Sequence, residues 1–293
     1  MTRIINTTKQ LKAFKKSCKK KNKIINFVPT MGSLHKGHEE LIKKAKKRNG
    51  ICVTSIFVNP LQFSEKNDYL NYPKNNNQDL KILEDLAVDY LILLNEEEFL
   101  GPSFSSLIIN KKPHNSLCEI DRPGHFEGVA TVIAKFLISL NPDFLYLGEK
   151  DFQQILIIEK LIRDFNFDTR VIRVKIVREK DGLAFSSRNK LLIERNRKIA
   201  PFLFKSLSFL RDRILKSNFE IDEIKDVKIK LIKEGFEFVN YLEIRKERNL
   251  AIIDDVPSKC RVFSSVGLNN IRLIDNLFIG KLSVSNGKIN NFN

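Results

Sequence analysis

Apolar positions in the first 176 residues follow two alternating spacings. Nearly continuous apolar runs end at short polar turns and predict buried strands of a parallel sheet, at residues 24–30, 51–58, 90–94, 144–147 and 170–174. Between these runs, apolar residues recur three and four apart and predict helices with one buried face, at residues 39–47, 81–86, 129–140 and 155–165. Strands that alternate with helices indicate an α/β domain with a parallel sheet.

The pattern changes after residue 176. Two helices in succession are expected at residues 199–215 and 221–232, followed by short strands at 239–244, 261–264 and 271–274. This is the order of a smaller α+β domain rather than a continuation of the alternating one. We therefore expect two domains, over residues 1–176 and 177–293.

Composition narrows the class of protein. The chain has 293 residues, enough for a substantial core. No apolar run approaches the roughly 20 residues that span a bilayer, and no signal-peptide core follows the first residues. The four cysteines are scattered, without a CxxC pair, which argues against disulfide or zinc frameworks. We expect a soluble cytoplasmic protein without a membrane partner.

The formal net charge of +16 has two interpretations. It is typical of a protein with a polyanionic partner, and it is equally typical of a general compositional bias toward lysine. The lysines are spread over the whole chain, and the densest run, residues 19–23, contains no aromatic residue. We favour the bias and expect no nucleic-acid partner.

The most informative segment, residues 29–38, joins the first long strand to the following helix. Ligands of open parallel sheets bind at this end of the strands. Gly32 and Gly37 allow close approach of the backbone, and the helix N-terminus favours anions. His35 and His38 are placed to donate hydrogen bonds to phosphate oxygens. Two alternatives stay open for this pair, namely metal ligation and surface histidines without a role.

Polar residues also follow the other strands. Residues 57–63 form a proline turn that carries Gln62, and residues 122–128 bring arginine and histidine to the start of a helix. Residues 147–154 hold Lys150, whose ammonium group suits a phosphate. Residues 178–189 end in Ser-Ser-Arg-Asn, a plausible phosphate clamp at the domain boundary. Each segment alone is weak evidence, but their shared position predicts a nucleotide site.

Five strings in order resemble the pantoate–β-alanine ligase (pantothenate synthetase) family. They are Pro-Thr-Met-Gly-x-Leu-His-x-Gly-His, Phe-Val-Asn-Pro-x-Gln-Phe, Arg-Pro-Gly-His-Phe, Gly-Glu-Lys-Asp-x-Gln-Gln and Asp-Gly-Leu-Ala-x-Ser-Ser-Arg-Asn, which span residues 29–189. The first contains the HxGH signature of the nucleotidyltransferase superfamily. The C-terminal part matches more loosely, at residues 240–244 and 272–276.

The resemblance implies a Rossmann-like domain that binds ATP and pantoate, followed by a C-terminal α+β lid domain. It implies a reaction in two steps. Pantoate attacks the α-phosphate of ATP to give pantoyl adenylate and pyrophosphate, and the amine of β-alanine then releases AMP. It also implies Mg²⁺ with ATP and a homodimer.

Residue roles follow from the resemblance by matched position. Catalytic residues that stabilise charge on the ATP phosphates would be His35, His38, Lys150 and Arg188. Further contacts to ATP would come from Met31, Gly148, Asp151, Ser186 and Ser187. The pantoate pocket would contain Gln62, Gln154 and Met31. Family positions near the site without a clear role are Asn59, Arg122 and His125. No residue is expected to be a dedicated metal ligand.

Two other functions compete with this one. A nucleotidyltransferase that stops after nucleotidyl transfer would share the HxGH segment, but Gln62 and Gln154 argue for an acyl substrate. An RNA-binding or tRNA-charging protein would suit the positive charge, but the chain has no room for an anticodon-binding domain and no recognisable RNA-binding module.

Overall fold

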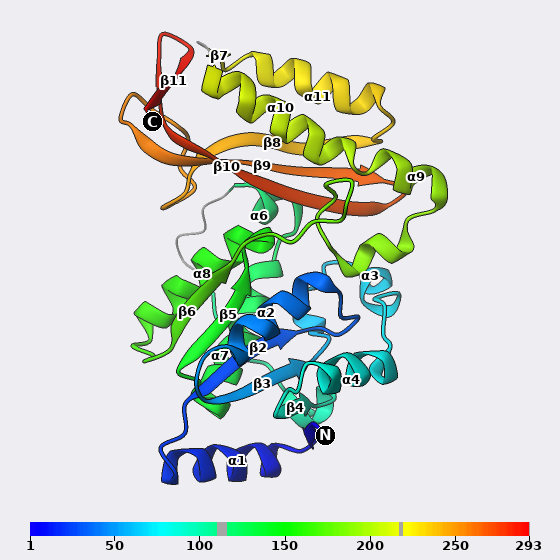
Figure 1. Ribbon diagram of the computed structural model, residues 1–293, viewed down its shortest axis with the longest axis vertical. Helices are drawn as coiled ribbons and strands as arrows, with labels where there is room; N and C mark the ends of the chain where they lie inside the picture. Colours follow the sequence, from blue (N-terminus) through cyan, green and yellow to red (C-terminus); the bar gives the residue numbers. More distant parts are fainter. Residues whose placement is uncertain (110–115, 217–218, 293) are drawn as a thin grey trace. The chain divides into compact units, whose positions relative to one another are not determined.

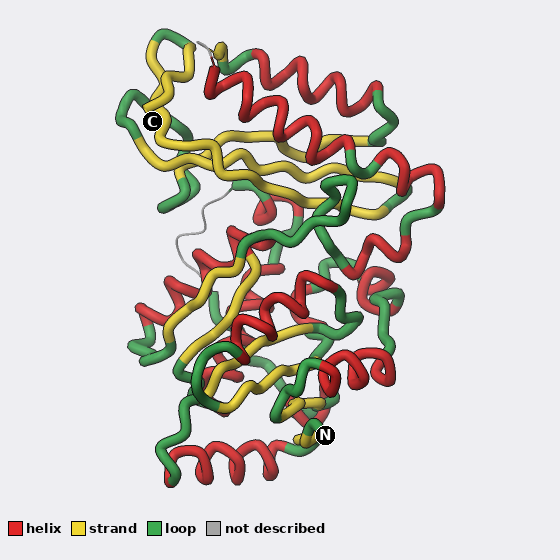
Figure 2. The backbone as a smooth tube through the Cα atoms, in the orientation of Figure 1, coloured by secondary structure: helices red, strands yellow, loops and turns green. Residues whose placement is uncertain are grey.

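The structure of the chain is a computed structural model that describes residues 1–109, 116–216 and 219–292. These residues form two compact units (Figures 1 and 2). The first unit comprises Met1–Lys111 and Arg122–Val177, and the second comprises Lys112–Asp121 and Arg178–Asn293. The second unit thus includes a short stretch that precedes part of the first unit in the chain.

A parallel sheet forms the centre of the first unit. Within the described residues it has six strands in the order β1-β4-β3-β2-β5-β6. Their bounds are β1 (Arg3–Ile5), β2 (Ile25–Thr30), β3 (Ile51–Ile56), β4 (Tyr90–Leu93), β5 (Phe144–Gly148) and β6 (Arg170–Val174). The expected parallel α/β sheet is confirmed. The three-residue strand β1 at the sheet edge is too short for its pattern to be recognised.

Helices cover both faces of this sheet. The bounds are α1 (Thr8–Lys20), α2 (Lys36–Lys46), α3 (Lys66–Leu70), α4 (Asn76–Asp85), α5 (Glu96–Phe99), α7 (His125–Leu140) and α8 (Phe152–Asp164), with 3-10 turns η1 (Pro60–Gln62) and η2 (Glu149–Asp151). Phe27 and Val53 face the core that contains α1, α7 and α8. Their neighbours Val28 and Cys52 face the core that contains α2 and α4. Successive residues of a strand point to opposite faces, so nearly continuous apolar strands serve both layers.

The second unit contains an antiparallel sheet. In the described part of the chain it has five strands in the order β7-β11-β10-β9-β8. Its elements are α6 (Cys118–Asp121), η3 (Ser187–Leu191), α9 (Glu194–Ile199), α10 (Phe202–Lys216), β7 (Phe219–Glu220), α11 (Glu223–Lys233), β8 (Phe238–Lys246), β9 (Ser258–Leu268), β10 (Ile271–Ser285) and β11 (Lys288–Phe292). Helices α10 and α11 lie on one face (Figure 1), where Leu207, Leu210 and Leu231 pack with strand residues. The expected α+β character is confirmed.

Two details of the second unit differ from the sequence prediction. The helix expected over residues 199–215 is confirmed as α10, but it begins three residues later, at Phe202, because the preceding helix α9 ends at Ile199. Pro201 has no amide hydrogen and is tolerated only in the first turn of a helix, so it separates the two. The strands β9 and β10 extend well beyond residues 261–264 and 271–274. Buried polar residues such as Ser265 and Asp275 interrupt the apolar pattern there.

No helix within the described ranges is long and apolar enough to cross a membrane.

Candidate active site

The turn between β2 and α2 has an unusual backbone. Gly32 and Ser33 adopt φ of 80° and 49°, in the left-handed region that most residues avoid. A Cβ on Gly32 would lie 3.0 Å from a carboxylate oxygen of Asp79. Glycine therefore fits both the backbone angle and the space. The turn lies directly after the carboxyl end of a central strand.

Asp79 of α4 holds this turn in place. Its Oδ2 accepts a hydrogen bond from the Ser33 amide and its Oδ1 accepts one from the Leu34 amide, both at 2.7 Å. The side chain belongs to a residue that is only 1% exposed. Sequence reasoning missed Asp79. A signal existed, because Asp79 lies four residues before the buried Leu83 and so occupies the apolar face of its helix.

His35 and His38 lie together at the N-terminus of α2. His35 is the N-cap, and its Nδ1 accepts a hydrogen bond from the Gly37 amide at 3.1 Å. This cap starts the helix at Lys36, three residues before the start expected from the sequence. The two ring centres are 4.0 Å apart. With Nδ1 as acceptor, the neutral ring of His35 carries its proton on Nε2. Both imidazoles therefore sit where the helix dipole is positive.

Asn59 and Gln62 form a bonded cluster after β3. The Asn59 Oδ1 caps η1 by accepting from the Leu61 amide at 3.1 Å. Its Nδ2 donates to Gln62 Oε1 at 3.0 Å and to the Gly128 carbonyl at 3.1 Å. The Gln62 Nε2 lies 3.1 Å from the sulfur of Met31. Two of the three residues assigned by resemblance to the pantoate pocket, Met31 and Gln62, are thus in contact.

Arg122 and His125 hold the backbone of Gln62. An Arg122 NH2 group donates to the Gln62 carbonyl at 3.0 Å, and His125 Nδ1 lies 2.8 Å from the same oxygen. Since a carbonyl only accepts, this Nδ1 carries the proton. His125 is 9% exposed. The geometry therefore gives both residues, whose roles the sequence left open, a common partner.

Helix α7 approaches η1 very closely at Gly128. A Cβ on Gly128 would lie 2.2 Å from the Leu61 carbonyl oxygen. Any side chain there would push the two elements apart. The absence of a side chain at this position allows the Asn59 bond to the Gly128 carbonyl.

Lys150 and Asp151 lie in η2, directly after β5. Strand β5 pairs in parallel with β2, so Gly148 ends at the same edge of the sheet as the histidine turn. The Lys150 Nζ is 3.3 Å from Asp151 Oδ1. Gln154 is half-buried in the first turn of α8. The candidate residues of the first unit therefore gather at the carboxyl edge of one sheet.

Ser186, Ser187 and Arg188 belong to the second unit. The Ser186 Oγ accepts from the Arg188 amide at 3.3 Å and so caps η3. Ser187 is buried. The structure thus places this predicted phosphate clamp at the start of the short helical turn η3.

Metal ligation is one of the alternatives left open for His35 and His38. Within residues 1–109, 116–216 and 219–292, no group of three or more His, Cys, Asp and Glu side chains is arranged to hold a metal ion. His35 instead uses Nδ1 as a helix cap.

Comparison with known proteins identifies the family. The chain matches the sequence model of the Pantoate-beta-alanine ligase family over residues 3–278. It is 38% identical over 277 residues to the pantothenate synthetase of Caldicellulosiruptor bescii, covering 94% of this chain and 98% of that protein. It is 39% identical to the pantothenate synthetase of Thermosipho africanus, covering 94% and 100%.

Solved structures similar to this chain carry the same family names as its relatives in sequence. A pantothenate synthetase from Thermus thermophilus superposes with a TM-score of 0.87 at 34% identity, covering 95% of this chain and 99% of that one. A pantoate-beta-alanine ligase from Francisella tularensis, described as complexed with beta-gamma ATP and beta-alanine, superposes with a TM-score of 0.81 at 35% identity, covering 95% and 98%. The predicted resemblance is confirmed, and this chain belongs to the pantoate–β-alanine ligase family of enzymes.

Proposed function

We propose that this protein condenses pantoate with β-alanine to form pantothenate, with ATP converted to AMP and pyrophosphate through a pantoyl-adenylate intermediate. The observation that carries the proposal is the pair His35 and His38, packed together at a helix N-terminus and at the same sheet edge as Lys150. The Francisella relative, described as complexed with beta-gamma ATP and beta-alanine, supports ATP and β-alanine as substrates here.

Adenylation brings two anions together and therefore requires positive potential and fixed hydrogen-bond donors. A pantoate carboxylate oxygen attacks the α-phosphorus of ATP, and the bond to pyrophosphate breaks. His35, His38 and Lys150 stabilise the charge that develops on the phosphate oxygens, because their donors are already oriented before reaction. Arg188, Ser186 and Ser187 contribute further donors to the phosphates.

Gln62 orients pantoate through its side-chain amide, with Met31 and Gln154 completing the pocket. Asn59, Arg122 and His125 act on pantoate indirectly, because they bond to the side chain or carbonyl of Gln62. Gly148 and Asp151 contact the ribose of ATP. We assign Mg²⁺ to the ATP substrate, where it is bound by the phosphates.

The second step needs orientation rather than a protein nucleophile. The β-alanine amine attacks the acyl carbon of the adenylate, the carbon–oxygen bond breaks, and AMP leaves with that oxygen. Correct positioning can lower such barriers by roughly 7–11 kcal/mol. Buried thiols are poor nucleophiles, and burial raises the pKa of Cys52 to about 12.

We further propose that the enzyme is cytoplasmic and acts as a homodimer without nucleic-acid or membrane partners.

Oxygen labelling tests the intermediate directly. With pantoate labelled by ¹⁸O in its carboxylate, the adenylate route transfers one label to AMP and retains the other in the amide of pantothenate. Mass spectrometry of both products measures the distribution. Label in inorganic phosphate together with ADP would instead indicate an acyl phosphate and contradict the proposal.

A further inference from the structure

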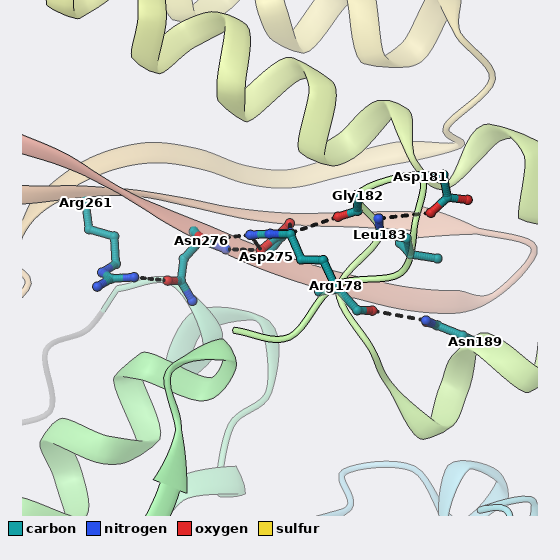
Figure 3. Close-up of polar contacts among 9 residues, drawn as sticks. Arg178, Asp181, Gly182, Leu183, Asn189, Arg261, Asp275 and Asn276 are labelled. Atoms are coloured by element: carbon teal, nitrogen blue, oxygen red, sulfur yellow. Dashed lines mark hydrogen bonds and ion pairs between the residues drawn. The ribbon is translucent and has the colours of Figure 1, made fainter. Parts of the chain in front are cut away.

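The segment that carries Ser186, Ser187 and Arg188 begins with a closed loop. Arg178 and Ala184 form an antiparallel bridge, and the Glu179 amide donates to the Leu183 carbonyl at 2.8 Å. Gly182 turns the loop with a φ of +94°. Figure 3 shows this loop beside β10. Its shape is therefore set by local bonds, while Arg178 attaches it to strand β10.

Arg178 bonds to Asp275 with both arms of its guanidinium. Its NH1 lies 2.6 Å from Oδ2 and its NH2 lies 2.9 Å from Oδ1. The same NH1 donates to the Gly182 carbonyl at 3.1 Å. The guanidinium carbon lies 3.9 Å from the ring centre of Phe204. One side chain thus connects the loop, strand β10 and helix α10.

Asp275 is itself fixed within the sheet. Its side chain is 2% exposed, and its Oδ1 accepts a hydrogen bond from the Asn276 amide at 2.7 Å. The Asn276 Oδ1 accepts from Arg261 of β9 at 2.6 Å (Figure 3). Arg261 in turn pairs with Glu247 at 2.9 Å. The partner that Arg178 contacts is therefore a rigid part of the sheet.

The far end of the segment is tied to its beginning. Asn189 Nδ2 donates to Glu179 Oε1 at 2.9 Å and to the Ala184 carbonyl at 3.0 Å. Arg197 of α9 pairs with Glu179 at 2.7 Å and with Asp181 at 2.6 Å. Residues between 184 and 189 therefore lie between two anchored points.

We propose that Arg178 and Asp275 are positioning residues that fix the phosphate-binding segment to the C-terminal sheet and thereby set productive binding of ATP. This inference rests on the proposed function of Ser186, Ser187 and Arg188. Only arginine has the planar fork that bonds both carboxylate oxygens and a carbonyl together. Neither residue touches substrate, so the effect on catalysis is transmitted through the segment.

The substitution Arg178→Lys tests the contact between Arg178 and Asp275. It keeps a positive charge beside the buried carboxylate, and this charge favours folding. A single ammonium group cannot reproduce the fork. We expect the KM for ATP to rise and kcat for AMP formation to fall, together by about 10- to 100-fold, as for other small misplacements of reacting groups. The KM for pantoate stays within about twofold, because its pocket residues belong to the first unit.

Arg245→Lys is the matched control. Arg245 also lies in the second unit, pairs with Glu243 and has a side chain that is 16% exposed, as Arg178 has. We expect wild-type kinetics from it. Hydrogen exchange over residues 183–191 supplies a readout that needs no turnover, and it should become faster in Arg178→Lys but not in Arg245→Lys.

Three results overturn the inference. They are wild-type ATP kinetics in Arg178→Lys, unchanged exchange in residues 183–191, and an equal kinetic loss in Arg245→Lys. The first of these results, combined with a lower melting temperature, would show that the pair is merely structural. Failure of the proposed function can be distinguished from failure of this inference. In that case the wild-type enzyme would form no AMP, while hydrogen exchange would still test the contact between Arg178 and Asp275.

Discussion

At the scale of single residues, Asp79 determines the geometry of the histidine turn. Its two carboxylate oxygens accept from two successive amides, and the turn they hold contains two left-handed residues. Backbone of this kind persists only when its surroundings hold it. Asp79 thereby connects the N-terminus of one helix to the start of another that carries His35 and His38.

The substitution Asp79→Asn leaves one of these amides without an acceptor, because an amide side chain has one oxygen. We expect unfolding to become easier by about 1–3 kcal/mol, the cost of an unsatisfied buried donor. AMP formation should slow by about 10- to 100-fold, because the histidines lose their fixed positions. Denaturant titration and steady-state kinetics measure both effects. The exposed Asp85 of the same helix provides the control Asp85→Asn, and identical behaviour of the two variants would remove Asp79 from this role.

Replacing His38 or Lys150 by alanine tests charge stabilisation. We expect each variant to lose about 10²–10³ in turnover, as expected for one donor to a developing negative charge. Lys44→Ala on the exposed face of α2 changes the same helix and the net charge without touching the site. Wild-type turnover in both His38→Ala and Lys150→Ala would exclude them from catalysis.

The buried thiols predict loss of stability at alkaline pH. Burial raises the pKa of Cys52 to about 12 and that of Cys260 to about 11, from 9.0 in the unfolded chain. The neutral thiols contribute their full stability below pH 9, and this contribution is lost as the pH rises toward the folded-state values. Denaturant titrations between pH 8 and about 11 should show falling stability. The change should be smaller in Cys52→Ala, and an equal decline in that variant would contradict this origin.

At the scale of elements, strands and helices of the first unit were predictable because their apolar spacing reports burial directly. The strands of the second unit were less predictable from apolar spacing. Ser264, Ser265 and Asp275 are buried in strands whose apolar pattern is interrupted. Their burial depends on partners distant in sequence, such as the Arg178 guanidinium for Asp275. Pro201 was a recognisable break that apolar spacing alone obscured.

The candidate site also contains features that the sequence predicts and features that it does not. Motifs at strand ends were visible in the sequence, since strand order brings them to one edge. The shared partner of Arg122 and His125 was not, because it is a backbone carbonyl more than 60 residues away in the case of His125. No residue-type pattern identifies a backbone partner. Their roles toward substrate stay a prediction.

The contact between α7 and η1 predicts the effect of Gly128→Ala. The added methyl group would lie 2.2 Å from the Leu61 carbonyl oxygen, so η1 must move. Gln62 moves with η1, and we expect the KM for pantoate to rise by about tenfold or more with a smaller change in the KM for ATP. Gly124→Ala is a suitable comparison for the loss of a glycine, since a Cβ there meets nothing within 4 Å. Its positive φ strains the backbone without a clash. Unchanged pantoate kinetics in Gly128→Ala would contradict the link between this contact and the pocket.

At the scale of the whole molecule, the family relationship extends over nearly all of the chain. Relatives are covered over 98–100% of their length, and the solved structures share both units. The assignment of the net charge of +16 to compositional bias stays a prediction.

The central claim is that one polypeptide performs both adenylation and amide formation. The most direct measurement is release of AMP and pyrophosphate from ATP, Mg²⁺ and pantoate, with and without β-alanine. We predict that sustained AMP release requires both pantoate and β-alanine and matches pantothenate formed one to one. Pyrophosphate release without any β-alanine-dependent AMP would contradict the claim, as would a complete lack of turnover by the folded protein.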